Sequence, residues 1–230
     1  MSKSDKNKIW AKEKASVDKI TDRLGLKIDD GIKDCVIALR LLGLNTTASH
    51  EGKIDRYPIP YIDLASPNIG KFMEKRDEII CRLQTPEEKE TEKEIDHLYH
   101  KLNELDSNDE FQVEKIKKSI KELTSKYKDF KFPASAEIEE IDKKIISENF
   151  ETEKKIELLL EEFYKNRVSP KEARLQINVS YLGEIRLKSS GAEIQENETD
   201  GETKLNRLKL FQNEMADFTN FLKNKFISLP

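Results

Sequence analysis

Residues 28–64 read IDDGIKDCVIALRLLGLNTTASHEGKIDRYPIPYIDL, and the rest of the chain is organised around them. Asp29 occupies the position of a helix N-cap, and apolar residues recur after it at steps of three and four, which predicts a helix with one buried face. Gly43 is placed to end this helix, because glycine adopts the left-handed backbone conformation without a steric penalty. The apolar face of this helix is therefore expected to pack against a hydrophobic core.

Two strands follow the predicted helix. Residues 44–50 alternate as a strand does, although they are polar for a buried strand, and residues 61–64 form a return strand. Between them the chain leaves the sheet at Glu51 and Gly52. Pro60 stands at or just before the first residue of the return strand, where no backbone donor is needed.

This stretch resembles the core signature of an uncharacterised bacterial protein family. The signature reads approximately I-D-x-G-I-K-x-x-V-x-x-L-x-x-x-G-x-x-T-x-x-S-C-E-G-H and continues with P-[WY]-[IV]-[DE]. The matching positions are Ile28, Asp29, Gly31, Ile32, Lys33, Val36, Leu39, Gly43, Ser49, Glu51, Gly52, Pro60, Tyr61, Ile62 and Asp63. His50 stands where the family has Cys and Lys53 where it has His, so the resemblance implies no thiol or metal chemistry here. The turn of Ser49, Gly52 and Lys53 is also similar to one in the tRNA wybutosine-synthesis methyltransferases.

A second pair of strands is expected late in the chain. Residues 174–180 alternate between polar and apolar side chains, and the alternation resumes over residues 184–188 after Gly183. This pattern predicts a β-hairpin with one apolar face and one polar, partly basic face. Residues 189–203 are rich in turn-forming and acidic residues, which favours a mobile loop, and residues 204–227 form a helix with a phenylalanine-rich stripe.

The segment between the two strand pairs is predicted to be helical. Residues 66–168 carry apolar residues at steps of three and four, interrupted by turn-forming residues at 106–109 and by a break at 130–133. The helices on either side of 106–109 have heptad-like seams, which predicts an antiparallel helical hairpin. The outside of this hairpin is almost entirely Lys and Glu.

Together these patterns predict an α+β fold. We expect a small, mostly antiparallel sheet of about four strands packed with helices, plus a long inserted antiparallel helical-hairpin (coiled-coil) arm. Residues 1–65 would form an N-terminal helix and the first half of the α/β body, residues 66–168 the arm, and residues 169–230 the β-hairpin and C-terminal helix that complete the body.

Composition narrows the class of protein. Charged residues make up 37% of the chain, against about 25% in typical globular domains, which favours long exposed helices. The net charge of -4 does not indicate a globally basic nucleic-acid binder but allows a local basic patch. Cys35 and Cys81 fit a reducing interior, and no apolar run approaches the ~20 residues needed to cross a bilayer. We therefore expect a cytoplasmic protein without membrane attachment.

One group of residues forms the candidate ligand site. It combines the turn after the first strand with the polar side of the late hairpin: Ser49, His50, Glu51, Gly52, Lys53, Arg56, Arg174, Arg186 and Lys188, with Asn178 beside them. If both segments share one sheet, these side chains make a positive patch. Such a patch suits a phosphate or carboxylate, because Arg offers two-pronged donors and Gly52 lets backbone N–H groups approach an anion. The alternative is a solvated sheet face with a glycine that the turn requires.

Catalytic and metal roles have weaker support in the sequence. Histidine is the residue type suited to proton transfer near neutral pH, and His50 stands beside Glu51, which makes both candidate catalytic residues. Neighbours on a strand point to opposite faces, however, and this argues against their acting as a pair. His97 and His100 are three residues apart on a predicted helix, but two ligands do not define a metal site. We expect no metal and no cofactor.

Three functions are consistent with these patterns. The first, which we favour, is a binding protein whose α/β body holds an anionic ligand, a nucleotide or an RNA phosphate, and whose arm serves self-association or contact with a protein partner. The second is an enzyme that acts on nucleotides or RNA through the Ser49-His50-Glu51 turn. The third is a purely structural interaction module that binds through its coiled-coil arm.

Overall fold

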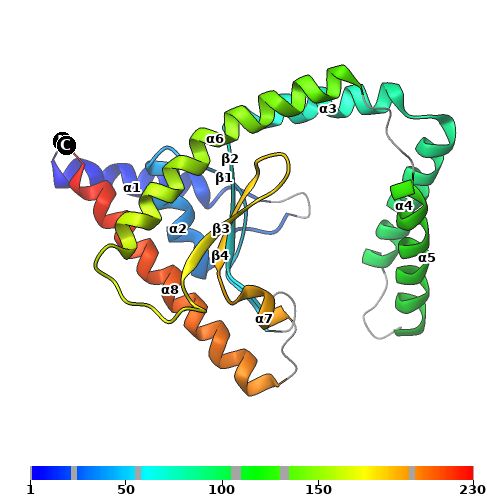
Figure 1. Cartoon of the computed structure of the whole chain (residues 1–230). Coiled ribbons are helices and arrows are strands. Elements are labelled where there is room, and N and C mark those ends of the chain that lie inside the picture. Colours follow the sequence, from blue (N-terminus) through cyan, green and yellow to red (C-terminus); the bar gives the residue numbers. More distant parts are fainter. Residues whose placement is uncertain are drawn as a thin grey trace. The chain divides into compact units, whose positions relative to one another are not determined.

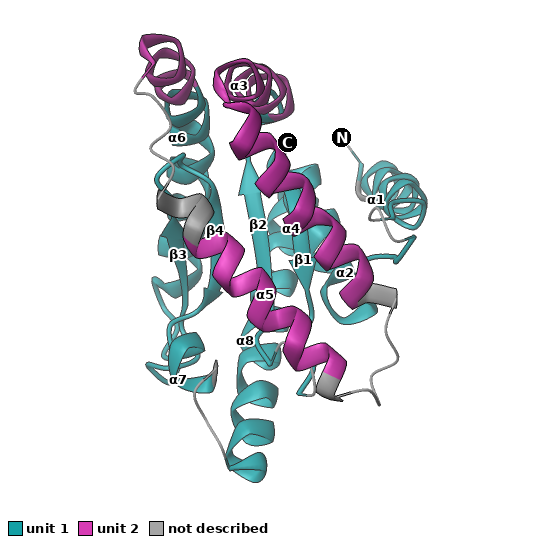
Figure 2. Cartoon of the chain, turned by 90° about the vertical axis from the view of Figure 1, so that its right-hand side faces the viewer, with its two compact units in different colours: residues 1–69, 145–230 teal, residues 70–144 magenta. Residues whose placement is uncertain are grey.

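The computed structural model describes residues 2–21, 25–54, 58–104, 110–129, 135–196 and 200–229 (Figure 1). Within these residues the chain forms eight helices and one four-stranded sheet, which confirms the α+β class. Its internal contacts divide it into two compact units (Figure 2): residues 1–69 with residues 145–230, and residues 70–144.

The sheet lies in the first unit and has the strand order β1-β2-β4-β3. The strands are β1 (Asn45–His50), β2 (Tyr61–Ala65), β3 (Leu175–Val179) and β4 (Ile185–Ser189). All three strand pairs are antiparallel. The two strand pairs, far apart in the sequence, meet where β2 pairs with β4, so that Tyr61 lies opposite Lys188. The predicted four-stranded antiparallel sheet is confirmed.

Helices cover one face of this sheet (Figure 1). They are α2 (Asp30–Leu41), the part of α6 (Ala136–Tyr164) that belongs to the first unit, and α8 (Gly201–Ser228). Their apolar faces and the inward strand residues form one core, in which Leu39, Ile156 and Phe218 are fully buried. Gly43 follows α2 with a φ of 77°, in the left-handed region expected for a helix-ending glycine.

The other face of the sheet is polar. Successive side chains on a strand point to opposite faces, and in β2 and β4 the buried Ile62 and Leu187 alternate with partly exposed polar residues. We define the polar face by the partly exposed or exposed residues that share this side in the strand register: Ala48, His50, Tyr61, Asp63, Gln176, Asn178, Arg186 and Lys188.

Helix α1 (Lys3–Val17) packs on α2 and α8. The ring of Trp10 lies 6.4 Å from that of Phe226, and the buried Lys6 ammonium donates to the Phe226 carbonyl at 3.1 Å. The Phe226 carbonyl also accepts from the Leu229 N–H at 3.3 Å, so Lys6 adds a second, charged donor at the C-terminal end of α8, where lysine is favoured.

Residues 192–196 form the short helix α7 (Ala192–Glu196), so the predicted mobile loop over residues 189–203 is wrong there. Gln195 is buried and donates to the Lys204 carbonyl at 2.7 Å. Packing against α8 orders this segment despite its turn-rich sequence.

The second unit contains α3 (Ile69–Leu83), α4 (Pro86–Glu104), α5 (Glu110–Asp129) and the first residues of α6. Helices α4 and α5 pack on each other, which confirms the helical hairpin. Helix α3 pairs with α6 through the Arg76–Asp142 ion pair at 2.7 Å. The expected turn at 106–109 and the break at 130–133 lie outside the described residues.

Candidate functional site

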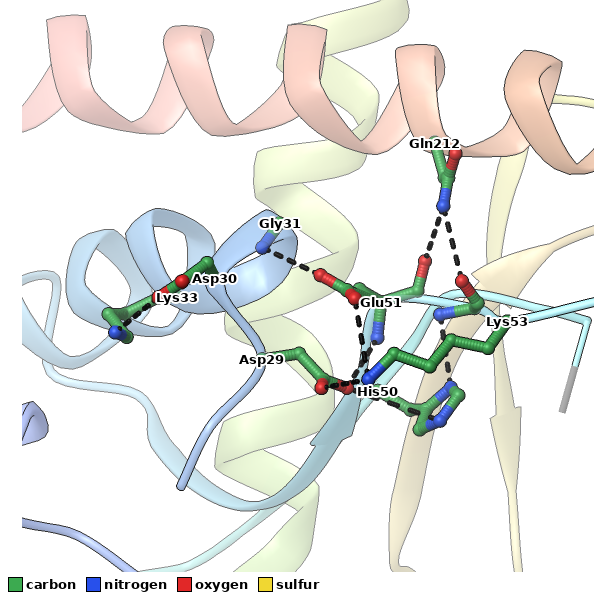
Figure 3. A network of polar contacts seen from close by, with 9 residues as sticks. Asp29, Asp30, Gly31, Lys33, His50, Glu51, Lys53 and Gln212 are labelled. Atoms are coloured by element: carbon green, nitrogen blue, oxygen red, sulfur yellow. Dashed lines mark hydrogen bonds and ion pairs between the residues drawn. The ribbon is translucent and has the colours of Figure 1, made fainter. Parts of the chain in front are cut away.

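The turn after β1 is joined to the start of α2 by two exchanged hydrogen bonds (Figure 3). Asp29 is the N-cap residue of α2 but makes no side-chain capping bond; its carboxylate accepts instead from the Glu51 backbone N–H at 3.3 Å. Glu51 accepts at Oε2 from the Gly31 backbone N–H at 2.8 Å. Each carboxylate therefore satisfies a backbone donor of the other segment, and Glu51 caps the helix from a distance.

The same turn neutralises Lys53. Its ammonium lies 2.6 Å from Asp29 Oδ1 and 3.5 Å from Glu51 Oε1. Burial opposes ionisation of Asp29, but the bonds from Lys53 and from the Glu51 N–H outweigh it and hold the pKa of Asp29 below its usual value. The bond to Asp29 raises the pKa of Lys53. Lys53 thus belongs to an ion pair at the root of the turn.

Gly52 has partners within the protein for both of its backbone polar groups. Its N–H donates to His50 Nδ1 at 3.0 Å, and Gln212 of α8 donates to the carbonyls of Glu51 and Gly52 at 3.1 and 3.2 Å (Figure 3). The backbone N–H groups of Glu51 and Gly52, which the sequence suggested for an anion, are therefore already bonded inside the protein. The turn is fastened to α2 on one side and to α8 on the other.

Ser49, His50 and Glu51 do not converge. His50 is in register with Tyr61 on the polar face, whereas Ser49 is in register with the buried Ile62 and Glu51 has left the strand to cap α2. Because His50 Nδ1 accepts from Gly52, the ring carries its proton on Nε2, which lies 4.0 Å from Asp29. No nucleophile, base and acid meet among the described residues of this turn.

The polar face brings together three of the predicted site residues, His50, Arg186 and Lys188. His50 stacks on Tyr61, with ring centroids 6.0 Å apart and planes 15° apart. Arg186 lies 4.2 Å from the centre of the Tyr61 ring and donates to both oxygens of Asp63 at 2.7 Å. Lys188 is in register with Tyr61 on one side and Gln176 on the other. Among the residues that the structure describes, it has no ion-pair partner.

Two hollows lie along this face and share Thr47. One, of about 380 Å³, is lined by β1 residues, Tyr61 and the segment around Leu26. The other, of about 390 Å³, is lined by residues that include Asp63, Asn178, Arg186 and Lys188. Tyr61 and Asp63 were not among the site residues predicted from the sequence. Their alternation with buried residues in β2 is the signal that places them beside Arg186 and Lys188.

The remaining candidates lie elsewhere. Arg174 precedes β3, and its guanidinium stands 4.4 Å from the centre of the Tyr164 ring of α6. Arg56 is outside the described residues. Asn178 is on the polar face, in register with Arg186.

A buried polar cluster around Glu214 was not foreseen. Its carboxylate accepts from Tyr164 at 2.8 Å, Ser169 at 2.7 Å and Arg167 at 2.9 Å. Burial opposes ionisation, yet these three bonds hold the pKa of Glu214 below its usual value, and burial raises the pKa of Tyr164. Tyr164 also accepts from the Leu175 backbone N–H at 2.7 Å, so the cluster ties α8 to the start of β3.

Neither a metal-ligand cluster nor a membrane-spanning helix occurs among the described residues. No group of three or more His, Cys, Asp or Glu side chains there is arranged to hold a metal ion. His97 and His100 are exposed on α4. None of the helices in this part of the chain combines the length and the apolar character that a bilayer crossing requires.

Comparisons with protein-family models, with curated proteins and with solved structures found no match to this chain. The resemblance of residues 28–64 to a bacterial family signature stays a prediction.

Proposed function

We propose that the protein binds a nucleotide, free or as part of an RNA strand, on the polar face of its sheet. One observation carries the proposal: His50, Tyr61, Lys188 and Gln176 form a row across all four strands. The row places two stacked rings beside a cation and an amide. A nucleotide needs the same three elements, a stacking surface for the base, a positive charge for the phosphate and hydrogen-bonding groups for the edges.

The charges on this face favour Lys188 as the group that meets the phosphate. Arg186 is held by two bonds to Asp63, so that this pair contributes no net charge. Lys53 is paired with Asp29 outside the polar face. Lys188, in contrast, has no ion-pair partner in the described part of the chain and is only partly exposed beside Tyr61. A phosphate at Lys188 leaves the base within reach of the Tyr61 ring, where it would take the place of the Arg186 guanidinium that covers the ring in the free protein.

Arg186 serves to position the ring and does not act as the main phosphate contact. Its guanidinium lies over Tyr61 while Asp63 fixes its plane from β2. A cation over an aromatic ring and a two-pronged carboxylate bond each restrict rotation. The two hollows along the polar face have volumes of about 380 and 390 Å³, which are within the range of small-ligand sites. We also propose the cytoplasmic location expected from the sequence.

The test is a titration of the full chain with ribonucleoside triphosphates and with a mixed-sequence single-stranded RNA, followed by calorimetry or fluorescence anisotropy. Lys188→Gln should abolish measurable binding, and Tyr61→Ala should weaken it. Lys209→Gln, which removes an exposed charge from α8, is the matched control and should bind as the native chain does. The proposal would be refuted if Lys188→Gln bound as tightly as the native chain, or if the native chain bound neither probe.

A further inference from the structure

The α4–α5 hairpin leaves much of its apolar seam partly exposed. Ile116 and Ile120 of α5 are buried, but Ile95, Leu98 and Leu102 of α4 are only half-buried. Two helices can cover only the sides that face each other, and stable bundles close the seam with further helices. The hairpin therefore has an apolar surface that a third and a fourth helix could complete.

A groove marks where such helices would lie. It has a volume of about 450 Å³ and runs between α4 and α5; the residues that line it are Tyr99, Leu102, Lys117, Ile120, Lys121, Thr124 and Ser125. Tyr99 projects at its rim with 49% of its surface exposed. Thr124 and Ser125 are small, so another helix can approach α5 closely at this point.

The two helices beside the groove differ in their overall charge. Helix α4 contains seven acidic residues and three lysines, whereas α5 contains six lysines and four acidic residues. On the groove side, Asp96 precedes Tyr99 by three residues and so shares its face of α4. Lys121 lines the opposite flank. Among the described residues it has no ion-pair partner.

We propose that a second copy of this chain docks in the groove to form an antiparallel four-helix bundle, with α4 of each copy against α5 of the other. A two-fold axis parallel to the helices gives this arrangement and keeps every neighbouring pair antiparallel. Rotation about this axis leaves the position of each residue along the bundle unchanged. Asp96 of one copy therefore meets Lys121 of the other, and the same contact occurs twice. The two Tyr99 rings fill the two grooves. This inference is independent of the ligand proposed for the sheet.

Charge complementarity selects the second copy as the occupant. An acidic helix beside a basic one is self-complementary after a two-fold rotation, since each copy offers both halves of the same pair. A different partner would need to carry its own acidic and basic flanks in the same order. If such a partner fills the groove instead, the isolated chain stays monomeric.

The first test measures the assembly state of the full chain by sedimentation equilibrium. Asp96→Lys and Lys121→Glu should each weaken dimerisation by roughly tenfold, because each replaces two attractive contacts per dimer with repulsive ones. The matched controls are Glu94→Lys and Lys115→Glu, which reverse exposed charges away from the groove and should dimerise as the native chain does. A monomeric native chain, or equal dissociation constants for Asp96→Lys and Glu94→Lys, would overturn the proposal.

A mixing experiment separates association from folding. Asp96→Lys and Lys121→Glu chains combined in equal amounts should form a heterodimer, since the two reversed side chains then face each other and the two native ones, Asp96 and Lys121, form the second pair. Tyr99→Ala should also dissociate the dimer, while Tyr99→Phe keeps it, and circular dichroism should show unchanged helix content in all variants. Failure of the two reversed chains to pair when mixed would overturn the α4-to-α5 arrangement.

Discussion

Replacing Gly52 with alanine tests how tightly the turn is fitted between α8 and the chain before β2. Gly52 has a φ of 83°, and a Cβ there would lie 2.7 Å from Leu208 Cδ1 and 3.0 Å from the backbone nitrogen of Pro60. The left-handed conformation costs a non-glycine residue about 1–2 kcal/mol. Forcing a methyl group into a filled space adds about 1–3 kcal/mol. Gly52→Ala should therefore lower the free energy of unfolding by about 2–5 kcal/mol.

Gly43→Ala is the control that separates these two contributions. Gly43 has almost the same φ, 77°, but a Cβ there would meet no atom within 4 Å. Its substitution should cost only the backbone part, about 1–2 kcal/mol. Urea unfolding of both variants, followed by far-UV circular dichroism, measures the difference. Equal losses for the two substitutions would refute the claim that the turn is closely packed.

A double-mutant cycle identifies the neighbour that the methyl group displaces. Leu208→Ala removes the closest contact, so the loss for Gly52→Ala with Leu208→Ala should be smaller than the sum of the single losses. Some of the cost should remain, because the backbone atoms of Pro60 and Ile59 cannot move as a flexible side chain does. Strict additivity would show that Leu208 does not restrict this position.

Four other side chains give further tests. Burial raises the pKa of Asp29, but the bonds from Lys53 and from the Glu51 N–H lower it by more. The net change is a decrease. The stability this gives is present above the unfolded pKa of about 3.9 and is lost as the pH falls through the lower folded value. Acid titration followed by circular dichroism should thus show the difference between native and Asp29→Asn chains shrinking below about pH 4, and a constant difference would contradict this. Lys53→Gln breaks a partly exposed ion pair, so urea unfolding should show only a small loss of stability and nucleotide titration no change; lost binding would show that Lys53 belongs to the ligand site. Glu214→Ala leaves buried donors on Tyr164 and Ser169 without an acceptor and should cost about 2–4 kcal/mol in urea unfolding, where a loss below about 1 kcal/mol would count against a buried network. RNA affinity of the native chain should fall with salt at a logarithmic slope of about -0.7 for one lysine–phosphate contact, and Lys209→Gln should keep that slope; a much steeper slope would mean that further cations bind.

The strand pattern predicted side-chain positions well where residues belong to a strand. Alternation over residues 184–188 indicates that Arg186 and Lys188 share one face, and the register of β4 places them there beside Tyr61 and Asp63. Lys53 and Arg174 lie outside the strands, where alternation has no physical basis. Their positions are set by the nearest partner of suitable chemistry, a carboxylate for Lys53 and an aromatic ring for Arg174.

Features that depend on distant contacts could not be read from local patterns. Asp29 stands at the N-cap position as predicted, but the side chain that caps the helix is Glu51. It accepts from the N–H of Gly31, which lies 20 residues earlier in the chain. Helix α7 is five residues long, too short for periodicity to reveal, and it is ordered by packing against α8. Its composition resembles a loop because few of its residues need to be apolar.

Four residues of the stretch that resembles the family signature pack against one another where the turn after β1 meets the start of α2. A Cβ on Gly31 would lie 2.7 Å from Glu51 Oε2, so a side chain there would displace the carboxylate that caps α2. Asp29, Gly31, Glu51 and Gly52 therefore require one another for packing and for satisfied backbone donors. These four residues thus have a structural role, which is to join the turn after β1 to the start of α2. Tyr61 and Asp63, which end the same stretch of sequence, lie instead on β2 beside Lys188 and Arg186, where their side chains belong to the polar face.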